Sequence, residues 1–273
     1  METVGLNFHD SFPPEREHIG RLLLLADNMP FMTKEEISAE TGIPTGESSG
    51  KVIPHIRYAE LMGLISVERG TGTFRLSKTP LGHEVLRVDP FLIESASQLL
   101  CHYRLTSKSG AALWHFMFRE YLVTHGTNVS RTDVERSATI RFGVKANLSP
   151  FAGCYTQPTS FGSLNLLTVG TNREGWTFTP HRYDQTLGYV YAWSLLWEWD
   201  MVAFGTNELT LNDIEERFKW GAPFLWDRST ILEVLTRLQD LQAVRLNRQL
   251  QPVTVIRTMS TEAALQKMYS LLV

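Results

Sequence analysis

Apolar side chains near the start of the chain recur at the spacing of one helix face. Within residues 15–26, the positions on that face are Ile19, Leu22, Leu23 and Ala26. This pattern predicts an amphipathic helix. Thr33 and Glu36 have the spacing of a capping box, which predicts the start of a second short helix, and Gly42 predicts its end.

A third helix and a hairpin are predicted directly afterwards. The helix covers residues 48–62, although Pro54 also suits a first helical turn, so a start near Pro54 is the alternative. Its apolar stripe consists of Val52, Ile56, Ala59 and Gly63. Residues 64–68 and 73–76 read as strands around a glycine-rich turn. Helices followed by a two-stranded hairpin have the order of a winged helix, so we predict a winged helix-turn-helix DNA-binding domain over residues 1–90.

The rest of the chain is predicted to hold two further regions. Residues 91–205 form a mainly helical middle region, with an N-cap at Ser130 and a loop-rich stretch with up to two strands at residues 148–178. Residues 206–273 repeat the N-terminal order, with a helix that begins at Asp227 before a hairpin and a last helix. We predict a second, degenerate winged-helix-like unit there. The predicted fold class is α+β, mainly α with small β-hairpins.

Composition restricts the class of protein. The 273 residues are 43% hydrophobic and 20% charged, which is typical of a folded protein and excludes a disordered chain. Cys101 and Cys154 are too few for a disulfide framework or a zinc cluster. The longest apolar run, residues 22–26, is far shorter than the roughly 20 residues that span a bilayer. Because no secretion signal is recognised either, we expect a soluble cytoplasmic protein with no membrane partner.

Charge is distributed unevenly along the chain. The net charge of −3 argues against a protein that covers nucleic acid through an overall positive charge. Residues 45–78, 101–145 and 228–257 nevertheless carry net charges of +2, +4 and +3. Basic stretches on an acidic chain favour local contacts with anions.

The third predicted helix and the hairpin carry the candidate DNA contacts. Residues 46–51 resemble a phosphate loop, but they lack the Walker spacing and do not follow a strand. Free N–H groups and hydroxyls at this helix start could hold a DNA phosphate; the alternative is a plain inter-helix turn. Arg57 and Tyr58 are expected to point away from the apolar stripe, and the alternative is a solvated face used for protein contacts. The candidate DNA-binding residues are Thr45, Ser48, Ser49, Lys51, His55, Arg57, Tyr58, Arg69, Arg75 and Lys78.

Two other side-chain groups have a plain and a functional interpretation. Trp193 and Trp197 lie one helical turn apart, which favours a buried aromatic core over stacking on unpaired bases. Catalytic motifs for zinc hydrolysis or nucleophilic catalysis are absent from the sequence, so no catalytic residue is assigned. Scattered oxygen ligands could serve a divalent ion, and the candidates chosen are His9, Asp10 and Glu17. Each of these is more simply explained as a solvated or capping group.

Several short segments resemble one bacterial family. They are Phe8-His9-Asp10-Ser11-Phe12-Pro13, Thr41-Gly42-Ile43-Pro44-Thr45-Gly46, Ser49-Gly50-Lys51-Val52, Ile56-Arg57-Tyr58-Ala59, Met62-Gly63-Leu64-Ile65, Thr79-Pro80-Leu81-Gly82 and Leu113-Trp114-His115. The resemblance is to DNA-modification proteins that include the SspB-type nickase of single-stranded DNA phosphorothioation systems, which act in anti-phage defence.

The resemblance implies a function, a cofactor and partners. It implies a Mg²⁺-dependent endonuclease that nicks DNA at selected sites, so that sulfur can enter one strand. The implied partners are DNA, a cysteine desulfurase, an ATP pyrophosphatase-like sulfur-transfer enzyme and an ATPase. Two alternatives stay open: a non-catalytic winged-helix adaptor or regulator that recruits the sulfur-transfer enzymes, and a protein-interaction scaffold.

Overall fold

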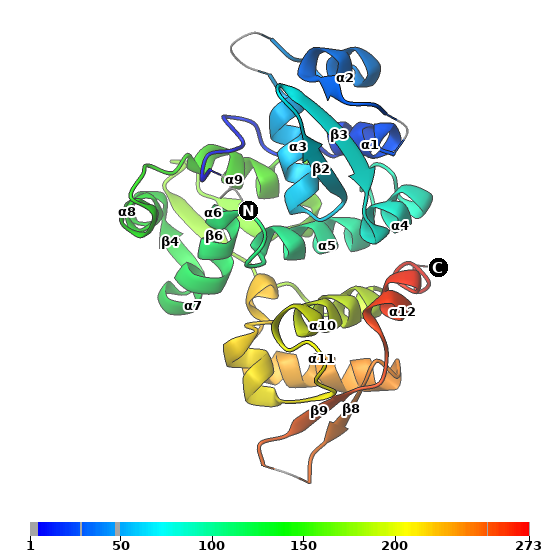
Figure 1. Ribbon diagram of the computed structural model, residues 1–273. Helices are drawn as coiled ribbons and strands as arrows, with labels where there is room; N and C mark the ends of the chain where they lie inside the picture. The colour runs from blue at the N-terminus through cyan, green and yellow to red at the C-terminus, as the bar shows by residue number, and fades with distance from the viewer. Residues whose placement is uncertain (1–4, 28, 47–49, 250, 273) are drawn as a thin grey trace. The chain divides into compact units, whose positions relative to one another are not determined.

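The computed structural model describes residues 5–27, 29–46, 50–249 and 251–272. The chain divides into two compact units, Met1–Thr179 and Pro180–Val273. In the described residues, helices combine with three small antiparallel sheets of three strands each (Figure 1). The predicted class of helices with small β-elements is therefore confirmed at this level.

The first module, residues 16–78, follows the predicted order of helices and hairpin. Its elements are α1 (Arg16–Leu25), β1 (Met32–Thr33), α2 (Lys34–Thr41), α3 (Val52–Leu61), β2 (Ile65–Arg69) and β3 (Thr73–Lys78), and α4 (Pro80–Val88) follows. The capping box is present, because the Glu36 N–H donates to the Thr33 hydroxyl and the Thr33 N–H donates to the Glu36 carboxylate. Two elements were not predicted: α4, and the short strand β1, which pairs with β3.

The middle of the chain contains more regular structure than its composition suggested. Its elements are α5 (Ser95–Thr106), α6 (Ala112–His115), the π-helical segment η1 (Phe116–Tyr121), α7 (Leu122–His125), β4 (Asn128–Ser130), α8 (Arg131–Phe142), α9 (Leu148–Thr156), η2 (Gly162–Leu164), β5 (Leu167–Val169) and β6 (Gly175–Phe178). The stretch 148–178 was expected to be loop-rich, but it begins with the helix α9. Asn147 caps this helix, and Phe151 and Tyr155 are buried side chains on one of its faces. The Gly, Ser and Pro residues between them obscured the helical periodicity in the sequence.

The second unit contains the predicted C-terminal elements. They are η3 (Gln185–Leu187), α10 (Gly188–Val202), β7 (Glu208–Thr210), η4 (Asp213–Arg217), η5 (Ala222–Phe224), α11 (Arg228–Asp240), β8 (Val244–Asn247), β9 (Thr254–Arg257) and α12 (Thr261–Gln266). The Asp227 carboxylate accepts the Thr230 N–H at 2.8 Å and so caps α11, as the sequence indicated.

One topology occurs three times within the described residues. The strand orders of the sheets are β1-β3-β2, β4-β6-β5 and β7-β9-β8, and in each case a helix, a short strand and helical segments precede a hairpin. We call the repeats the first (16–78), middle (112–178) and last (188–257) modules. Each has a hydroxyl cap at the end of its short strand, in which Thr33, Ser130 or Thr210 accepts a backbone N–H from three residues ahead. The prediction included the helices and hairpin of the first module and the hairpin with its preceding helices in the last, but it assigned α10 to the middle region and did not include a module at 112–178.

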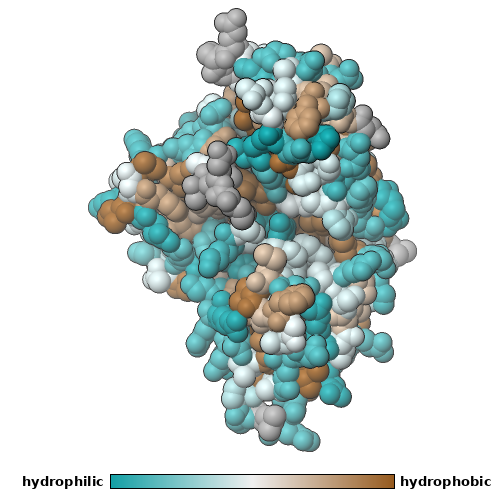
Figure 2. Space-filling model, viewed as in Figure 1, coloured by the Kyte–Doolittle hydropathy of each residue, from teal (hydrophilic) through white to brown (hydrophobic). Residues whose placement is uncertain are grey.

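Aromatic side chains fill much of the interior. Trp114, Trp176, Trp199 and Trp220 are each at most 2% exposed. Trp193 is 4% exposed and stacks on Trp197, with ring centroids 5.9 Å apart, which confirms the expected core position of Trp193. On the face drawn in Figure 2, hydrophilic residues predominate and hydrophobic ones are interspersed among them. Among the described helices, none has both the length and the apolar character required to cross a membrane.

Candidate functional site

The face of α3 that was expected to reach solvent is partly covered by the N-terminal segment. Tyr58 is fully buried, donates its hydroxyl to the Phe12 carbonyl at 3.0 Å, and contacts the rings of Phe8 and Trp114. The expectation that Tyr58 points outward is therefore wrong. Helical periodicity identified a polar face, but it carried no information about a distant segment that packs on it.

His55 is also fully buried, and both of its ring nitrogens have partners. Nδ1 lies 2.7 Å from the Lys51 carbonyl, and Nε2 accepts the Glu15 N–H at 3.0 Å. Burial lowers the pKa of His55 to about 4, so the imidazole is neutral at pH 7. In this arrangement His55 joins α3 to the start of α1 and is not available to read a base.

The arginines assigned to DNA contacts form ion pairs within the first module. On α3, Arg57 lies 3.2 Å from the Glu60 carboxylate, and Arg69 of β2 pairs with the same group. Arg75 pairs with Glu68, which is its partner in the β2–β3 register. The structure thus brings Arg57 and Arg69 together, but both guanidinium groups are paired with the Glu60 carboxylate.

The lysines of this set are paired in the same way. The Lys51 ammonium lies 2.6 Å from the Glu15 carboxylate. The Lys78 ammonium lies 3.0 Å from the Asp27 carboxylate, and its side chain is only 7% exposed. Thr45 is partly exposed in the loop before α3. The two remaining candidates lie outside the described residues: Ser48 and Ser49.

The candidate metal ligands chosen from the sequence lie in different settings. His9 is fully buried beside Phe8 and Trp114, and burial lowers its pKa. Asp10 is exposed, and Glu17 pairs with an arginine of its own helix. Among the described residues, a group of metal-ligating side chains with neighbouring ligand atoms does occur, but it contains none of these three candidates.

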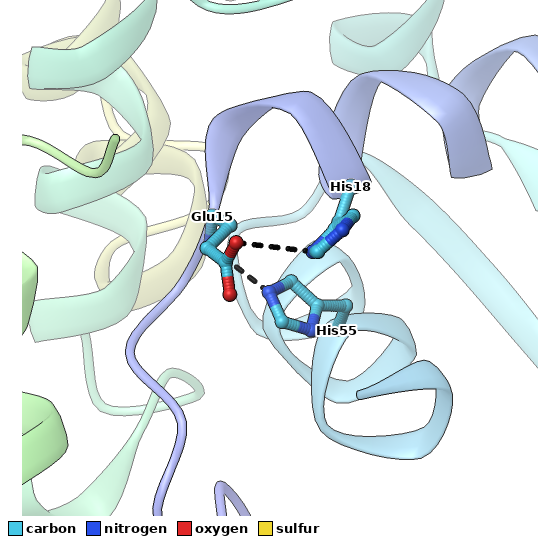
Figure 3. A group of neighbouring side chains, drawn as sticks. All are labelled: Glu15, His18 and His55. Carbon is cyan, nitrogen blue, oxygen red and sulfur yellow. Dashed lines mark hydrogen bonds and ion pairs between the residues drawn. The ribbon is translucent and has the colours of Figure 1, made fainter. Parts of the chain in front are cut away.

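That group is Glu15, His18 and His55, whose ligand atoms lie within 4.8 Å of one another (Figure 3). Glu15 is the N-cap of α1, His18 lies in the first turn of that helix, and His55 lies on α3. The His18 Nδ1 lies 3.6 Å from the Glu15 carboxylate, and burial lowers the pKa of His18. The sequence signal was the i, i+3 spacing of Glu15 and His18, but nothing local indicated His55.

This cluster does not fit Mg²⁺, the ion that the sequence resemblance implies. Mg²⁺ prefers hard oxygen ligands in octahedral geometry, whereas the cluster offers two imidazoles and one carboxylate. The Glu15 carboxylate already pairs with Lys51, and the His55 Nε2 already accepts a backbone N–H. We interpret the cluster as a structural link between α1 and α3.

A cavity in the middle module was not predicted. Its volume is about 610 Å³, and it lies between α9, the β5–β6 hairpin and the first residue of α8. Arg131 and Arg173 line it, together with Ser149, Thr156 and Trp176. The basic character of residues 101–145 was noticed in the sequence, but Arg173 lies outside that range, so spacing could not pair it with Arg131.

Comparison with known proteins gives a structural relationship. No family model matches the sequence, and no curated protein matches it. The crystal structure of magnesium ion-bound SspB has a TM-score of 0.75 and 17% identity, over 97% of this chain and 88% of that chain. A second SspB crystal structure has a TM-score of 0.73 and 16% identity, over 97% and 86%. The chain therefore has a fold similar to that of SspB.

Proposed function

We propose that this chain is a DNA-binding protein of a bacterial DNA phosphorothioation system. The observation that carries the proposal is the likeness to SspB, which extends over 97% of the chain and so includes all three modules. The sequence segments that resemble the SspB-type family, from Phe8 to His115, are separate support. In such a system the chain would act beside enzymes that mobilise and transfer sulfur.

The proposal includes a winged helix in the first module, within residues 1–90. A three-stranded sheet beside three helices supports it, because this is the order of elements in that fold. The contacts we assign to DNA are the partly exposed arginines Arg57, Arg69 and Arg75, with Thr45 and Lys51 near the start of α3. Each charged contact requires a phosphate to replace a carboxylate, because these side chains are paired with acids in the free protein. His55 and Tyr58 hold α3 in place.

Strand nicking is a second candidate activity. The observation in its favour is that one of the similar structures is magnesium ion-bound. The Glu15–His18–His55 cluster does not supply a Mg²⁺ site, so no catalytic step is assigned to it.

A supercoiled-plasmid assay distinguishes these functions. The purified protein is incubated with plasmid in Mg²⁺ and, separately, in EDTA, and binding to a labelled duplex is measured in parallel. Salt-sensitive binding without relaxation of the plasmid is the result expected for a DNA-binding adaptor. Open-circle product that forms only with Mg²⁺ would make the chain a nickase. Absence of DNA binding at low salt would contradict the proposal and favour a protein-interaction scaffold.

A further inference from the structure

The middle-module cavity lies where this topology places a helix beside a hairpin. α9 occupies the position in the middle module that α3 occupies in the first, since each is the last α-helix before the hairpin. Ser149, Ala152 and Thr156 of α9 line the cavity at helical spacing and present small or hydroxyl side chains. Thr168 of β5 and Arg173 of the turn after it also line the cavity. The cavity is therefore bounded by two elements that can both approach a ligand closely.

The charge of this cavity differs from that of the first module. None of its lining residues, all of which are described, is acidic. Arg131 makes a hydrogen bond of 3.3 Å to the Ser149 hydroxyl, and within the described part of the chain neither Arg131 nor Arg173 forms an ion pair. The Glu174 carboxylate interacts electrostatically with Arg131, but among the described residues it does not form an ion pair with it. Two guanidinium groups that line one cavity make this a site for an anion.

A backbone contact fixes the spacing of the two arginines. The Arg131 N–H donates to the Glu174 carbonyl at 2.8 Å, and Glu174 directly follows Arg173. The Glu174 carboxylate accepts hydrogen bonds from the Ser130 hydroxyl at 2.6 Å and the Thr132 N–H at 2.9 Å. This carboxylate lies at the first turn of α8 and caps the N-terminal end of that helix. The positive charge of the cavity therefore comes from the two arginine side chains and not from the helix end.

We propose that this cavity binds a backbone phosphate of DNA, with Arg131 and Arg173 as the ligands of the phosphate oxygens. The proposal rests on the proposed DNA-binding function in naming DNA as the source of the phosphate. A planar guanidinium can donate two parallel hydrogen bonds to phosphate oxygens. Both guanidinium groups line one cavity of about 610 Å³ that has no acidic lining residue, so a phosphate bound there need not displace a lining carboxylate. The middle module, rather than the first, then supplies the principal charged contact.

The test compares DNA affinity in matched arginine variants of the full chain. Fluorescence anisotropy gives the Kd for a labelled duplex and a labelled single strand at several salt concentrations. The variant Arg131→Gln/Arg173→Gln removes both cavity charges. Arg136→Gln is the control, because Arg136 is an exposed residue of the same helix, pairs with Asp133 and does not line the cavity. Thermal melting of each protein checks that it is folded.

We expect the double variant to bind at least one of the two probes about tenfold more weakly or worse. For the duplex, the slope of log K against log salt should become shallower by about 0.9, since the cavity is proposed to hold one phosphate and each phosphate contact contributes about that much. Arg136→Gln should stay within about twofold of the unsubstituted protein. If the double variant melts early, Thr156→Glu places a carboxylate at an exposed lining position and should weaken binding similarly.

Two other outcomes overturn the inference, and they differ in what they say of the function. If the unsubstituted protein binds DNA and the folded double variant binds it as tightly as Arg136→Gln does, the cavity is not the phosphate site and the proposed function stands. If the unsubstituted protein binds neither probe at low salt, the proposed function and the inference are both wrong.

Discussion

The backbone N–H of Thr258 donates to the carbonyl of Ala243 at 3.1 Å, and this bond has a counterpart in each of the other modules. Thr79 donates to Leu64 at 3.0 Å, and Thr179 donates to Leu166 at 3.1 Å. In all three, a threonine just after the hairpin is tied to the residue before the hairpin. The closing bond of the module is thus the same although the surrounding sequences differ.

The residue before each of these acceptors has a left-handed backbone. Gly63 has a φ of 70°, Asn165 of 52° and Gln242 of 58°. Each lies two positions before the first strand of its hairpin, where the chain turns out of the preceding helical region. Glycine and asparagine tolerate this conformation, whereas glutamine is strained in it.

We therefore predict that Gln242→Gly stabilises the last module. The substitution relieves the left-handed strain at an exposed side chain, and the gain should be about 0.5–1 kcal/mol after the greater freedom of glycine in the unfolded chain is counted. Urea denaturation measures the free energy of unfolding. Glu233→Gly, at an exposed position within α11, is the control and should destabilise by about 1 kcal/mol. A loss of stability in Gln242→Gly would contradict the prediction.

Glu60→Gln is predicted to strengthen DNA binding by the first module. Glu60 neutralises both Arg57 and Arg69, so its removal frees two cations for phosphates. Each such pair contributes up to about 1 kcal/mol, so the loss of both corresponds to an increase in affinity of about thirtyfold at most. Glu84→Gln is the control, since Glu84 pairs with Arg87 on α4. Equal Kd values for the two variants would show that α3 and its hairpin do not contact the DNA.

Trp193→Ala is predicted to destabilise the second unit by about 3–5 kcal/mol. The side chain lies on α10, is 4% exposed and stacks on Trp197, so its removal leaves a cavity where α10 packs in the core. Chemical denaturation followed by circular dichroism measures the loss. A stable variant with weakened binding to single-stranded DNA would instead assign Trp193 to base stacking.

His181 is predicted to make stability depend on pH. Burial lowers its pKa to about 4, and its Nε2 lies 2.7 Å from the Tyr191 hydroxyl, which can donate to the neutral ring. The unfolded chain binds the proton more readily than the folded chain does. The contribution of neutral His181 to the free energy of unfolding is therefore complete above about pH 6.5. It is lost as the pH falls towards 4, at up to about 1.4 kcal/mol per pH unit.

The measurement is the free energy of unfolding between pH 7 and pH 4.5. His181→Gln keeps an acceptor for Tyr191 and should make the pH dependence less steep, while His55, whose pKa is also lowered to about 4, keeps its own contribution. His125→Gln, at an exposed position, is the control. Identical slopes in the two variants would assign the acid sensitivity to other groups.

Local chemistry was sufficient to predict those elements that depend on neighbours in sequence. The Thr33–Glu36 capping box, the Asp227 cap and the first hairpin were all identified, because each involves residues a few positions apart. The strand β1 was missed, because a strand of two residues is defined only by its pairing with β3. Sequence periodicity contains no information about that pairing.

The candidate site depended more on distant contacts than the fold did. Tyr58 was assigned to a solvent face from its helical position, but Phe12 and Phe8 cover it from another segment. Counting charges along residues 45–78 gave a basic region, whereas Glu15 and Asp27, which neutralise Lys51 and Lys78, lie outside that range. A sum over a sequence range cannot include partners that folding brings in.

The bond between the Arg131 N–H and the Glu174 carbonyl has a consequence for how this protein can diverge. Because the bond uses main-chain atoms, any residue except proline at position 131 preserves it. The side chain at 131 can therefore be exchanged during evolution, or by an engineer, without moving the backbone that carries it. Position 173 is more restricted, because its φ of 61° is tolerated best by glycine, asparagine and aspartate. Related chains could keep the same backbone frame and select a different ligand by changing the side chain at 131.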